Sequence, residues 1–254
     1  MSGDTPSDVE ARARAWYRAR HSAVCDRIEP WAHGSIVRAS RFPDYFEFNL
    51  VRVEGDPGLS ARELMELADD ALAALPHRRI DFEPIEPADR VRADFEAAGW
   101  EVTRLLWLRH EAPLPPGPDV SVEAVAYDEV ADLRVRWNRE DFPDLDTTAF
   151  QIQARELALA QDVEVLAVRE RGEPVAFAQL QRDRTTAEVT HVYVHPDHRG
   201  NLMGTALTRA AVGAAGSVED LWIVADDEDR PKELYARLGF RPAWTSMELT
   251  RLPS

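Results

Sequence analysis

Hydrophobic and polar positions follow two periods along the chain, one typical of helices and one typical of strands. Residues 60–75 carry leucine and alanine three and four positions apart, as a half-buried helix does, whereas residues 45–53 alternate as a half-buried strand does. Helices are predicted over residues 8–25, 60–75, 88–98, 128–138, 147–160, 205–215 and 231–238, and strands over residues 35–39, 45–53, 79–82, 102–108, 120–124, 163–168, 174–181, 189–194, 220–224 and 244–249. This mixed order predicts an α/β protein.

A proline-rich segment divides the chain. Residues 112–119 (APLPPGPD) hold four prolines and a glycine, which neither continue a helix nor pair in a sheet. The segment predicts a linker between a domain at residues 1–111 and a second domain at residues 120–254. The two parts also resemble each other, because Phe95-Glu-Ala-Ala-Gly99-Trp100 aligns with Tyr235-Ala-Arg-Leu-Gly239-Phe240 at an offset of 235 − 95 = 140 residues. We interpret this repeat as a domain duplication.

Composition narrows the class of protein. Hydrophobic residues make up 44% of the chain, which is ample for a core. The formal net charge of −16 argues against nucleic-acid or anionic-membrane partners, and it favours either a cationic ligand or simple solubility. Cys25 is the sole cysteine, which excludes an intramolecular disulfide and a cysteine-rich metal site, and no metal is expected. The polar, acidic N-terminus lacks the blocks of a signal peptide, so a cytoplasmic protein is predicted.

The most informative stretch is residues 190–207, THVYVHPDHRGNLMGTAL. It predicts a strand that ends before Pro196, a turn framed by Arg199-Gly200 and Gly204, and then an alanine- and leucine-rich helix. The first N–H groups of a helix have no intrahelical partner, and the helix dipole places positive charge behind them. A glycine-bearing turn there lets a phosphate approach the backbone closely.

This stretch resembles motif A of the GCN5-related N-acetyltransferases, in which V-x-P-x-x-R-G-x-x-x-G binds the pyrophosphate of acetyl-coenzyme A. The matching residues are Val194, Pro196, Arg199, Gly200 and Gly204. Leu202 stands where the family often has a glycine or alanine. No Gly-Lys-Ser/Thr follows the turn, which excludes a P-loop, and the G-x-G-x-x-G spacing of a Rossmann fingerprint is absent.

A second segment resembles motif B of the same family, L-Y-x-x-x-G-F. Here it consists of Leu234, Tyr235, Gly239 and Phe240. The family often has asparagine seven residues before the tyrosine, whereas this chain has Glu228, which removes one hydrogen bond expected for the cofactor. The two motifs stand in the order and spacing of the family over residues 120–252. They imply two tandem acetyltransferase-like domains, each with a mixed, mostly antiparallel central sheet flanked by helices.

The resemblance implies a binding site for acetyl-coenzyme A along the predicted strand, turn and helix. In the family the strand that ends at Val194 splays from its neighbour, and the pantetheine arm pairs with the exposed backbone. The residues expected to bind the cofactor are Val192, Tyr193, Val194, His198, Arg199, Gly200, Asn201, Leu202, Met203, Gly204 and Thr205. The N-terminal copy has Glu54-Gly-Asp-Pro-Gly58 in place of this turn and Phe95 in place of Tyr235, so it is expected to be degenerate and to bind no coenzyme A.

Transfer of an acetyl group to an amine requires a base and an acid, because the amine must lose a proton and the thiolate gains one. Glu188 is the first candidate for the base, since it shares a strand face with Thr190 and Val192 in a regular strand. His191, predicted to face the other way, is the second. Tyr235 is the candidate for the acid.

The acceptor is expected to be a primary amine of a small molecule or peptide natural product, and a cationic acceptor is one candidate. Trp137, Asp141 and Phe142, in or beside the acidic segment 140–146, are candidates for binding it. Mycothiol synthases share the tandem layout, so a thiol-sugar amine is an alternative acceptor, and a non-catalytic acyl-coenzyme A sensor is a third possibility. The oligomeric state, monomer or homodimer, stays open.

Overall fold

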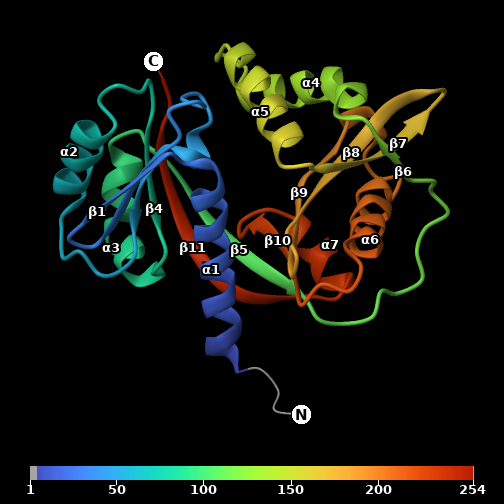
Figure 1. Ribbon diagram of the computed structural model, residues 1–254, viewed down its shortest axis with the longest axis horizontal. Helices are drawn as coiled ribbons and strands as arrows, with labels where there is room; N and C mark the ends of the chain where they lie inside the picture. Colours follow the sequence, from blue (N-terminus) through green and yellow to red (C-terminus); the bar gives the residue numbers. More distant parts are fainter. Residues whose placement is uncertain (1–4, 254) are drawn as a thin grey trace. The chain divides into compact units, whose positions relative to one another are not determined.

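The computed structural model describes residues 5–253, which form two compact units (Figure 1). The first unit contains the chain as far as Trp107, together with Ala225–Asp229 and the segment from Ala243 onward. The second contains Leu108–Val224 and Arg230–Pro242. Residues from the C-terminal strand therefore belong to the first unit. Among residues 5–253, none of the helices combines the length and the apolar character that a membrane crossing requires.

The first unit is a mixed sheet with helices on both faces. Its elements are α1 (Pro6–Val24), β1 (Arg27–Trp31), β2 (Gly34–Arg38), η1 (Phe46–Phe48), β3 (Leu50–Val53), α2 (Ala61–Ala71), β4 (Arg78–Phe82), α3 (Ile85–Ala97) and β5 (Glu101–His110) as far as Trp107. The strand order is β1-β2-β3-β4, followed by β11 (Phe240–Arg251) and β5. β3 and β4 are parallel, whereas the pairs β1–β2, β2–β3 and β4–β11 are antiparallel.

Side chains alternate between the two faces of this sheet as the strand period requires. Apolar residues pack against α2 and α3, namely Val51, Val53, Ile80, Phe82, Met247 and Leu249. The residues between them face α1 and are polar: the Tyr17 hydroxyl donates to Asp81 at 2.7 Å, and Arg52 contacts Nδ1 of His21 at 3.1 Å. One face of the first unit is therefore a hydrophobic core and the other a buried layer of charged groups.

The second unit has the same kind of architecture. Its elements are β6 (Glu123–Val125), η2 (Tyr127–Val130), α4 (Ala131–Asp141), α5 (Thr148–Ala160), β7 (Glu164–Glu170), β8 (Glu173–Arg182), β9 (Thr186–Val194), η3 (Pro196–His198), α6 (Met203–Ala215), β10 (Asp220–Asp226) as far as Val224, and α7 (Pro231–Arg237). The strand order is β10-β9-β8-β7-β6, in which only β10 and β9 pair in parallel. α4 and α5 cover one face of this sheet and α6 covers the other (Figure 1).

These elements confirm the predicted fold class and most of the predicted helices and strands. Two local predictions were wrong. Residues 45–53 do not form one strand, because the Asn49 side chain accepts the Ala39 N–H and donates to the carbonyls of Phe42 and Tyr45, which stabilises a turn before β3. The first helix begins at Pro6 rather than at Asp8, because Thr5 caps it and exchanges hydrogen bonds with Asp8 in a capping box.

The repeat inferred from sequence corresponds to a repeated topology. β3-α2-β4-α3-β5 in the N-terminal part and β9-α6-β10-α7-β11 in the C-terminal part both begin with a parallel strand pair joined through a helix. The turn between the first strand and the helix spans residues 54–60 in the first copy and residues 195–202 in the second.

Candidate active site

The feature that organises the second unit is the divergence of β9 from β10. The parallel ladder runs from Asp220 opposite Thr186 to Ile223 opposite Val189 and ends there, although β9 continues to Val194. Past Val189 the edge of β9 that faced β10 has no ladder partner in β10. The splayed strands expected from the family resemblance are therefore present.

A β-bulge lies just past the point of divergence. Thr190 pairs with Gln179 of β8, but Tyr193 pairs with Phe177, so one additional residue is accommodated in β9 between them. His191 lies in the bulge with φ of +53°. Because the bulge shifts the alternation, Tyr193 rather than Val192 shares the face of Glu188 and Thr190. The prediction that Val192 lies on that face was wrong.

The bulge also changes the direction of His191. Its ring lies 5.6 Å from the ring of Trp137, on the side of the sheet that α4 covers, and its Nδ1 lies 3.1 Å from the Thr190 hydroxyl. The prediction that His191 faces away from the side of Glu188 was therefore wrong, because a regular strand was assumed. Both candidate bases belong to the α4 side.

The backbone of Val194 points toward the divergence. The His195 N–H donates to the Val175 carbonyl, and Tyr193 pairs with Phe177, so the amide and carbonyl of the intervening residue, Val194, face away from β8. The Val194 carbonyl accepts a hydrogen bond from Nε of Arg199 at 3.0 Å. This strand edge is thus open to pairing with an extended group.

The turn that follows presents the start of α6. Gly200 has φ of +86° and Leu202 φ of +59°, and Leu202, the residue before the helix, makes no side-chain hydrogen bond to its first turn. Gly204 has no positive φ, and a Cβ built there would lie 3.8 Å from Cγ2 of Val194 and 3.7 Å from Cδ1 of Leu234. Those are ordinary contacts, so neither packing nor backbone angle requires glycine at this position. A ligand that approaches the first helical amides closely would require it.

The remaining predicted cofactor residues lie in the same strand–turn–helix. His198 is in η3 and pairs with Glu170 at 3.3 Å, Asn201 lies in the turn, and Thr205 is in the first turn of α6. Met203 is 6% exposed and belongs to the core of α6, so its side chain contributes packing. The backbone amides of this turn, rather than these side chains, are the groups available to bind a phosphate.

Motif B meets motif A in this region. A Cβ built on Gly204 would contact both Val194 and Leu234. The end of β9, the start of α6 and the helix α7 therefore lie next to one another. Tyr235, the next residue after Leu234, is 6% exposed, and its ring lies 6.2 Å from that of Phe240. The tyrosine predicted as the acid is therefore a buried residue of the element that packs against the divergence.

Glu188 is buried in the centre of the sheet, with 2% of its surface exposed. It lies between Trp222 of β10 and Gln181 of β8, one residue before the last paired position of the parallel ladder. Thr190 shares its face, as predicted. A carboxylate at this depth is unusual in a protein core, which favours a functional role for it.

α4 supplies the aromatic and acidic groups near the bulge. Trp137 stacks on Tyr193 at 5.5 Å and meets Phe177 at 6.0 Å. The Tyr193 hydroxyl donates to Glu140 at 2.5 Å, and Arg199 pairs with the same carboxylate at 3.2 Å. Burial, followed by this hydrogen bond, raises the pKa of Tyr193. Glu140 thus connects α4 to β9 and to the arginine of motif A.

The acidic segment, residues 140–146, begins inside α4 rather than in a loop. Glu140 and Asp141 are the last residues of α4, and Phe142 follows the helix directly. Partial burial raises the pKa of Asp141, and a hydrogen bond from Trp137 opposes that shift. The structure places Trp137 against the bulge. It places Asp141 and Phe142 one turn further along the chain.

Sequence reasoning missed Gln179, which is 4% exposed and lies opposite Thr190. Its signal was available, because Gln179 and Gln181 stand at alternate positions at the end of an otherwise apolar stretch, residues 175–181. Polar residues spaced by two within a buried strand indicate a polar patch on one sheet face.

The first unit differs at the equivalent place. β3 pairs with β4 as far as Val53 opposite Phe82, and the Glu83 N–H continues the ladder to the Val53 carbonyl, so these strands do not diverge. The start of α2 is capped by Ser60, which exchanges hydrogen bonds with Glu63. The N–H groups of Ser60 and Glu63 are therefore satisfied by the chain itself.

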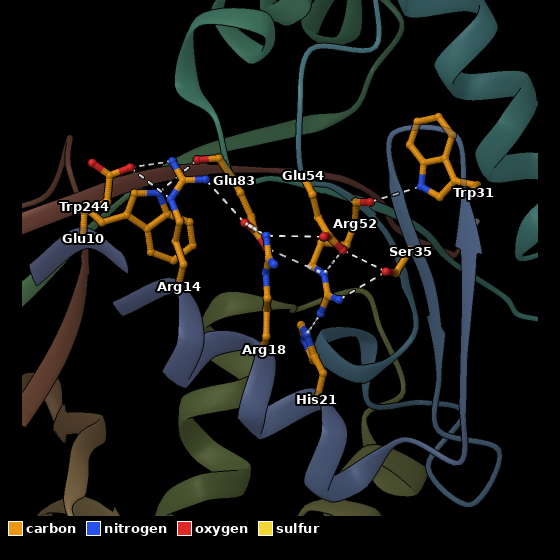
Figure 2. A network of polar contacts seen from close by, with 10 residues as sticks. All are labelled: Glu10, Arg14, Arg18, His21, Trp31, Ser35, Arg52, Glu54, Glu83 and Trp244. Atoms are coloured by element: carbon orange, nitrogen blue, oxygen red, sulfur yellow. Dashed lines mark hydrogen bonds and ion pairs between the residues drawn. The ribbon is translucent and has the colours of Figure 1, made fainter. Parts of the chain in front are cut away.

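An ionic network occupies the polar face beside this closed ladder, as Figure 2 shows. Glu83, whose side chain is fully buried, accepts from Arg18 at 2.5 and 2.7 Å and pairs with Arg14 at 3.4 Å and Arg52 at 3.7 Å. Glu54 pairs with Arg52 at 3.0 Å and with Arg18 at 3.3 Å. These arginines come from α1 and β3 and neutralise both carboxylates.

Comparison with known proteins agrees with this geometry. Residues 161–242 match the family model described as an acetyltransferase (GNAT) domain. The C-terminal half carries a GNAT acetyltransferase domain. The family predicted from motifs A and B is therefore confirmed for this half, and the match includes both motifs.

Solved structures resemble the chain over most of its length. A functionally unknown conserved protein from Staphylococcus epidermidis ATCC 12228 is 16% identical with a TM-score of 0.69, covering 91% of this chain and 95% of that one. A GCN5-related N-acetyltransferase from Kribbella flavida is 20% identical with a TM-score of 0.56, covering 94% and 95%. A tandem GNAT protein from the clavulanic acid biosynthesis pathway is 16% identical with a TM-score of 0.51, covering 80% and 75%. At these identities the likeness concerns the fold. No curated protein sequence matches the chain.

Proposed function

We propose that the second unit transfers an acetyl group from acetyl-coenzyme A to a primary amine of a small molecule or peptide. The observation that carries this proposal is the divergence of β9 from β10 beside an α6 start that has no side-chain cap. A diverging strand edge suits an extended pantetheine arm, and free helix amides suit a pyrophosphate. Acetyl-coenzyme A supplies the acetyl thioester.

The residues of the turn fit this cofactor by their geometry. Val194 offers its amide on the diverging edge, where its carbonyl already accepts from Arg199, and Gly204 leaves the first amides of α6 accessible. Arg199, exposed over 58% of its side chain, can turn from Glu140 toward a phosphate, because an exposed ion pair of this kind contributes little free energy.

Glu188 and Tyr235 are assigned the proton transfers. Glu188 takes the proton from the attacking amine, directly or through water, and His191 on the same side of the sheet is the second candidate for this role. Tyr235 gives its proton to the thiolate that leaves as the new amide forms. The tyrosine is suited to this role because a phenol and a thiol have pKa values within about two units of each other.

The test is release of free thiol from acetyl-coenzyme A in the presence of a panel of primary amines. We expect release with at least one amine and a loss of about 10²-fold or more in turnover for Glu188→Gln, at unchanged affinity for acetyl-coenzyme A. Glu173→Gln is a matched control, since it makes the same substitution at an exposed glutamate at the start of β8.

Two outcomes would contradict the proposal. Acetyl-coenzyme A binding without thiol release from any amine would favour the acyl-coenzyme A sensor. Full activity of Glu188→Gln would remove this residue from proton transfer and direct attention to His191.

A further inference from the structure

The face of α4 that packs on the sheet carries a buried arginine, Arg134, with unsatisfied hydrogen-bond donors. Arg134 is 1% exposed, yet its Nε and Nη1 have no hydrogen-bond partner among residues 5–253. None of the ion pairs found within the described part of the chain includes it. A buried charge of this kind is strongly unfavourable unless it is paired.

Two aromatic rings hold the guanidinium. Its Cζ lies 5.2 Å from the ring centre of Tyr127 and 5.6 Å from that of Phe177. Ring faces attract the cation but leave the N–H groups at its edge unsatisfied. Nε and Nη1 of the planar guanidinium are thus fixed in place without an acceptor.

Other buried hydrogen-bond donors on the sheet face that α4 covers also lack an acceptor. Nε2 of Gln179 and Nε1 of Trp222 also lack a hydrogen-bond partner within the part of the chain that the structure describes. Gln179 and Phe177 are on the same face of β8, and Trp222 is on the face of Glu188. All of these groups can donate, and an ionised carboxylate is the group that only accepts.

Arg134, Gln179 and Trp222 all lie on the side of the sheet on which the bulge presents its side chains. Trp137, one turn after Arg134 in α4, contacts Phe177, Tyr193 and His191 through its ring. Phe177, which lies beneath Arg134, is directly opposite Tyr193 in the sheet. A ligand that bridges Arg134 and the bulge would therefore lie along one face.

We propose that Arg134 binds a carboxylate carried by the amine acceptor, so that the substrate class is an amino carboxylate such as an amino acid or a short peptide. This inference rests on the proposed function. The planar guanidinium matches a carboxylate through two parallel hydrogen bonds, which an ammonium cannot do. The net charge of −16 does not oppose it, because exposed charges are screened over about 8 Å at physiological salt. Since Arg134 is buried, binding requires a local displacement of α4.

The first experiment compares pairs of acceptors that differ only in one group. Linear ω-amino carboxylates and short peptides are assayed beside their carboxamides, by thiol release from acetyl-coenzyme A. We expect kcat/KM to be about 10- to 100-fold higher for the carboxylates, which is the discrimination expected from one charge-assisted bidentate pair. The ratio should fall to about one in Arg134→Met and stay at the wild-type value in Arg136→Met, an exposed arginine of the same helix.

A second measurement does not depend on catalysis. Glutarate should raise the Tm of the wild-type protein and of Arg136→Met relative to sodium sulfate at equal ionic strength, and it should leave Arg134→Met unchanged. Arg134→Lys, which keeps the charge but loses the fork, should show a smaller rise. If Arg134→Met does not fold, the comparison of Arg134→Lys with wild type still tests the site.

The outcomes separate this proposal from the proposed function. Thiol release with equal preference for carboxylates and carboxamides would overturn the carboxylate site and leave acetyl transfer standing. Thermal stabilisation by glutarate that depends on Arg134, with no thiol release from any amine, would keep the anion site and overturn acetyl transfer. A preference for carboxylates that survives in Arg134→Met would assign the recognition to another residue and overturn the role of Arg134.

Discussion

Replacing Gly204 by glutamate should prevent acetyl-coenzyme A from binding while the second unit stays folded. A Cβ at this position makes only ordinary contacts, with Val194 at 3.8 Å and Leu234 at 3.7 Å, so the backbone of the helix is not expected to shift. Replacing glycine inside a helix gains up to about 1 kcal/mol, and a negative charge in the first turn gains about 0.3–1 kcal/mol. The free energy of unfolding should therefore be equal to or higher than that of wild type.

The same substitution should weaken the binding of acetyl-coenzyme A, although it does not destabilise the fold. A carboxylate beside the first amides of α6 competes for donors that a phosphate would use, each worth about 1.5–3 kcal/mol to a charged group. It also repels the phosphate by about 4 kcal/mol at 4 Å in a medium of intermediate dielectric constant. Even a loss of about 3–4 kcal/mol raises the Kd for acetyl-coenzyme A by a factor of about 10² to 10³.

Isothermal titration calorimetry with acetyl-coenzyme A measures this Kd, and circular dichroism follows the fold. Gly204→Gln separates the size of the side chain from its charge. Gly213→Glu is a matched control in the same helix, because a Cβ there meets nothing within 4 Å and the residue lies near the other end of α6. Wild-type affinity in a folded Gly204→Glu variant would refute the placement of the pyrophosphate at this turn.

Three further predictions follow from the structure. Tyr235→Phe should lower the single-turnover rate about 10²-fold or more at unchanged affinity for acetyl-coenzyme A, because only the hydroxyl is lost; an unchanged rate would exclude it as the acid. Burial lowers the pKa of His77 to about 4, below its unfolded value of about 6.5, so the unfolded state takes up this proton first. The free energy of unfolding should therefore fall as pH decreases from about 6.5 to about 4, and urea titrations of His77→Gln should show a weaker dependence. Glu83→Gln should cost about 3–5 kcal/mol in urea unfolding, because Arg14, Arg18 and Arg52 lose a buried counter-charge; a cost below 1 kcal/mol would show that Glu54 suffices for them.

The sequence predicts the strand–turn–helix of the second unit well because the signals are local. Pro196 ends β9, Gly200 supplies the positive φ that the turn requires, and the alanine-rich segment after Gly204 favours α6. Each of these effects acts within a few residues. Motif spacing alone therefore locates the turn and the helix that presents it.

The bulge at His191 could not be predicted in the same way. A constant alternation along β9 predicts Val192 on the face of Glu188 and His191 on the opposite face. A bulge is defined by the partner strand, and here β8 sets it by pairing Gln179 with Thr190 and Phe177 with Tyr193. The link from Glu140 to Tyr193 and Arg199 is equally non-local, since more than fifty residues separate its members in the sequence.

The contrast between the two units suggests why one copy would bind coenzyme A and the other would not. We infer that the first unit excludes it through three changes that act independently. Its strands β3 and β4 remain paired to Val53, which leaves no edge for a pantetheine arm. Its helix α2 is capped by Ser60 and Glu63, which leaves few free amides for a phosphate.

The third change is in the face that α1 covers. In the second unit the corresponding sheet face presents Glu188, Thr190 and the bulge, whereas in the first unit it holds the ionic network around Glu83. Introducing an Arg-Gly turn after β3 would restore none of these features except the turn itself. Such a variant should therefore gain no affinity for coenzyme A, and a measurable gain would mean that the turn sequence alone, rather than the divergence of the strands, decides which copy binds.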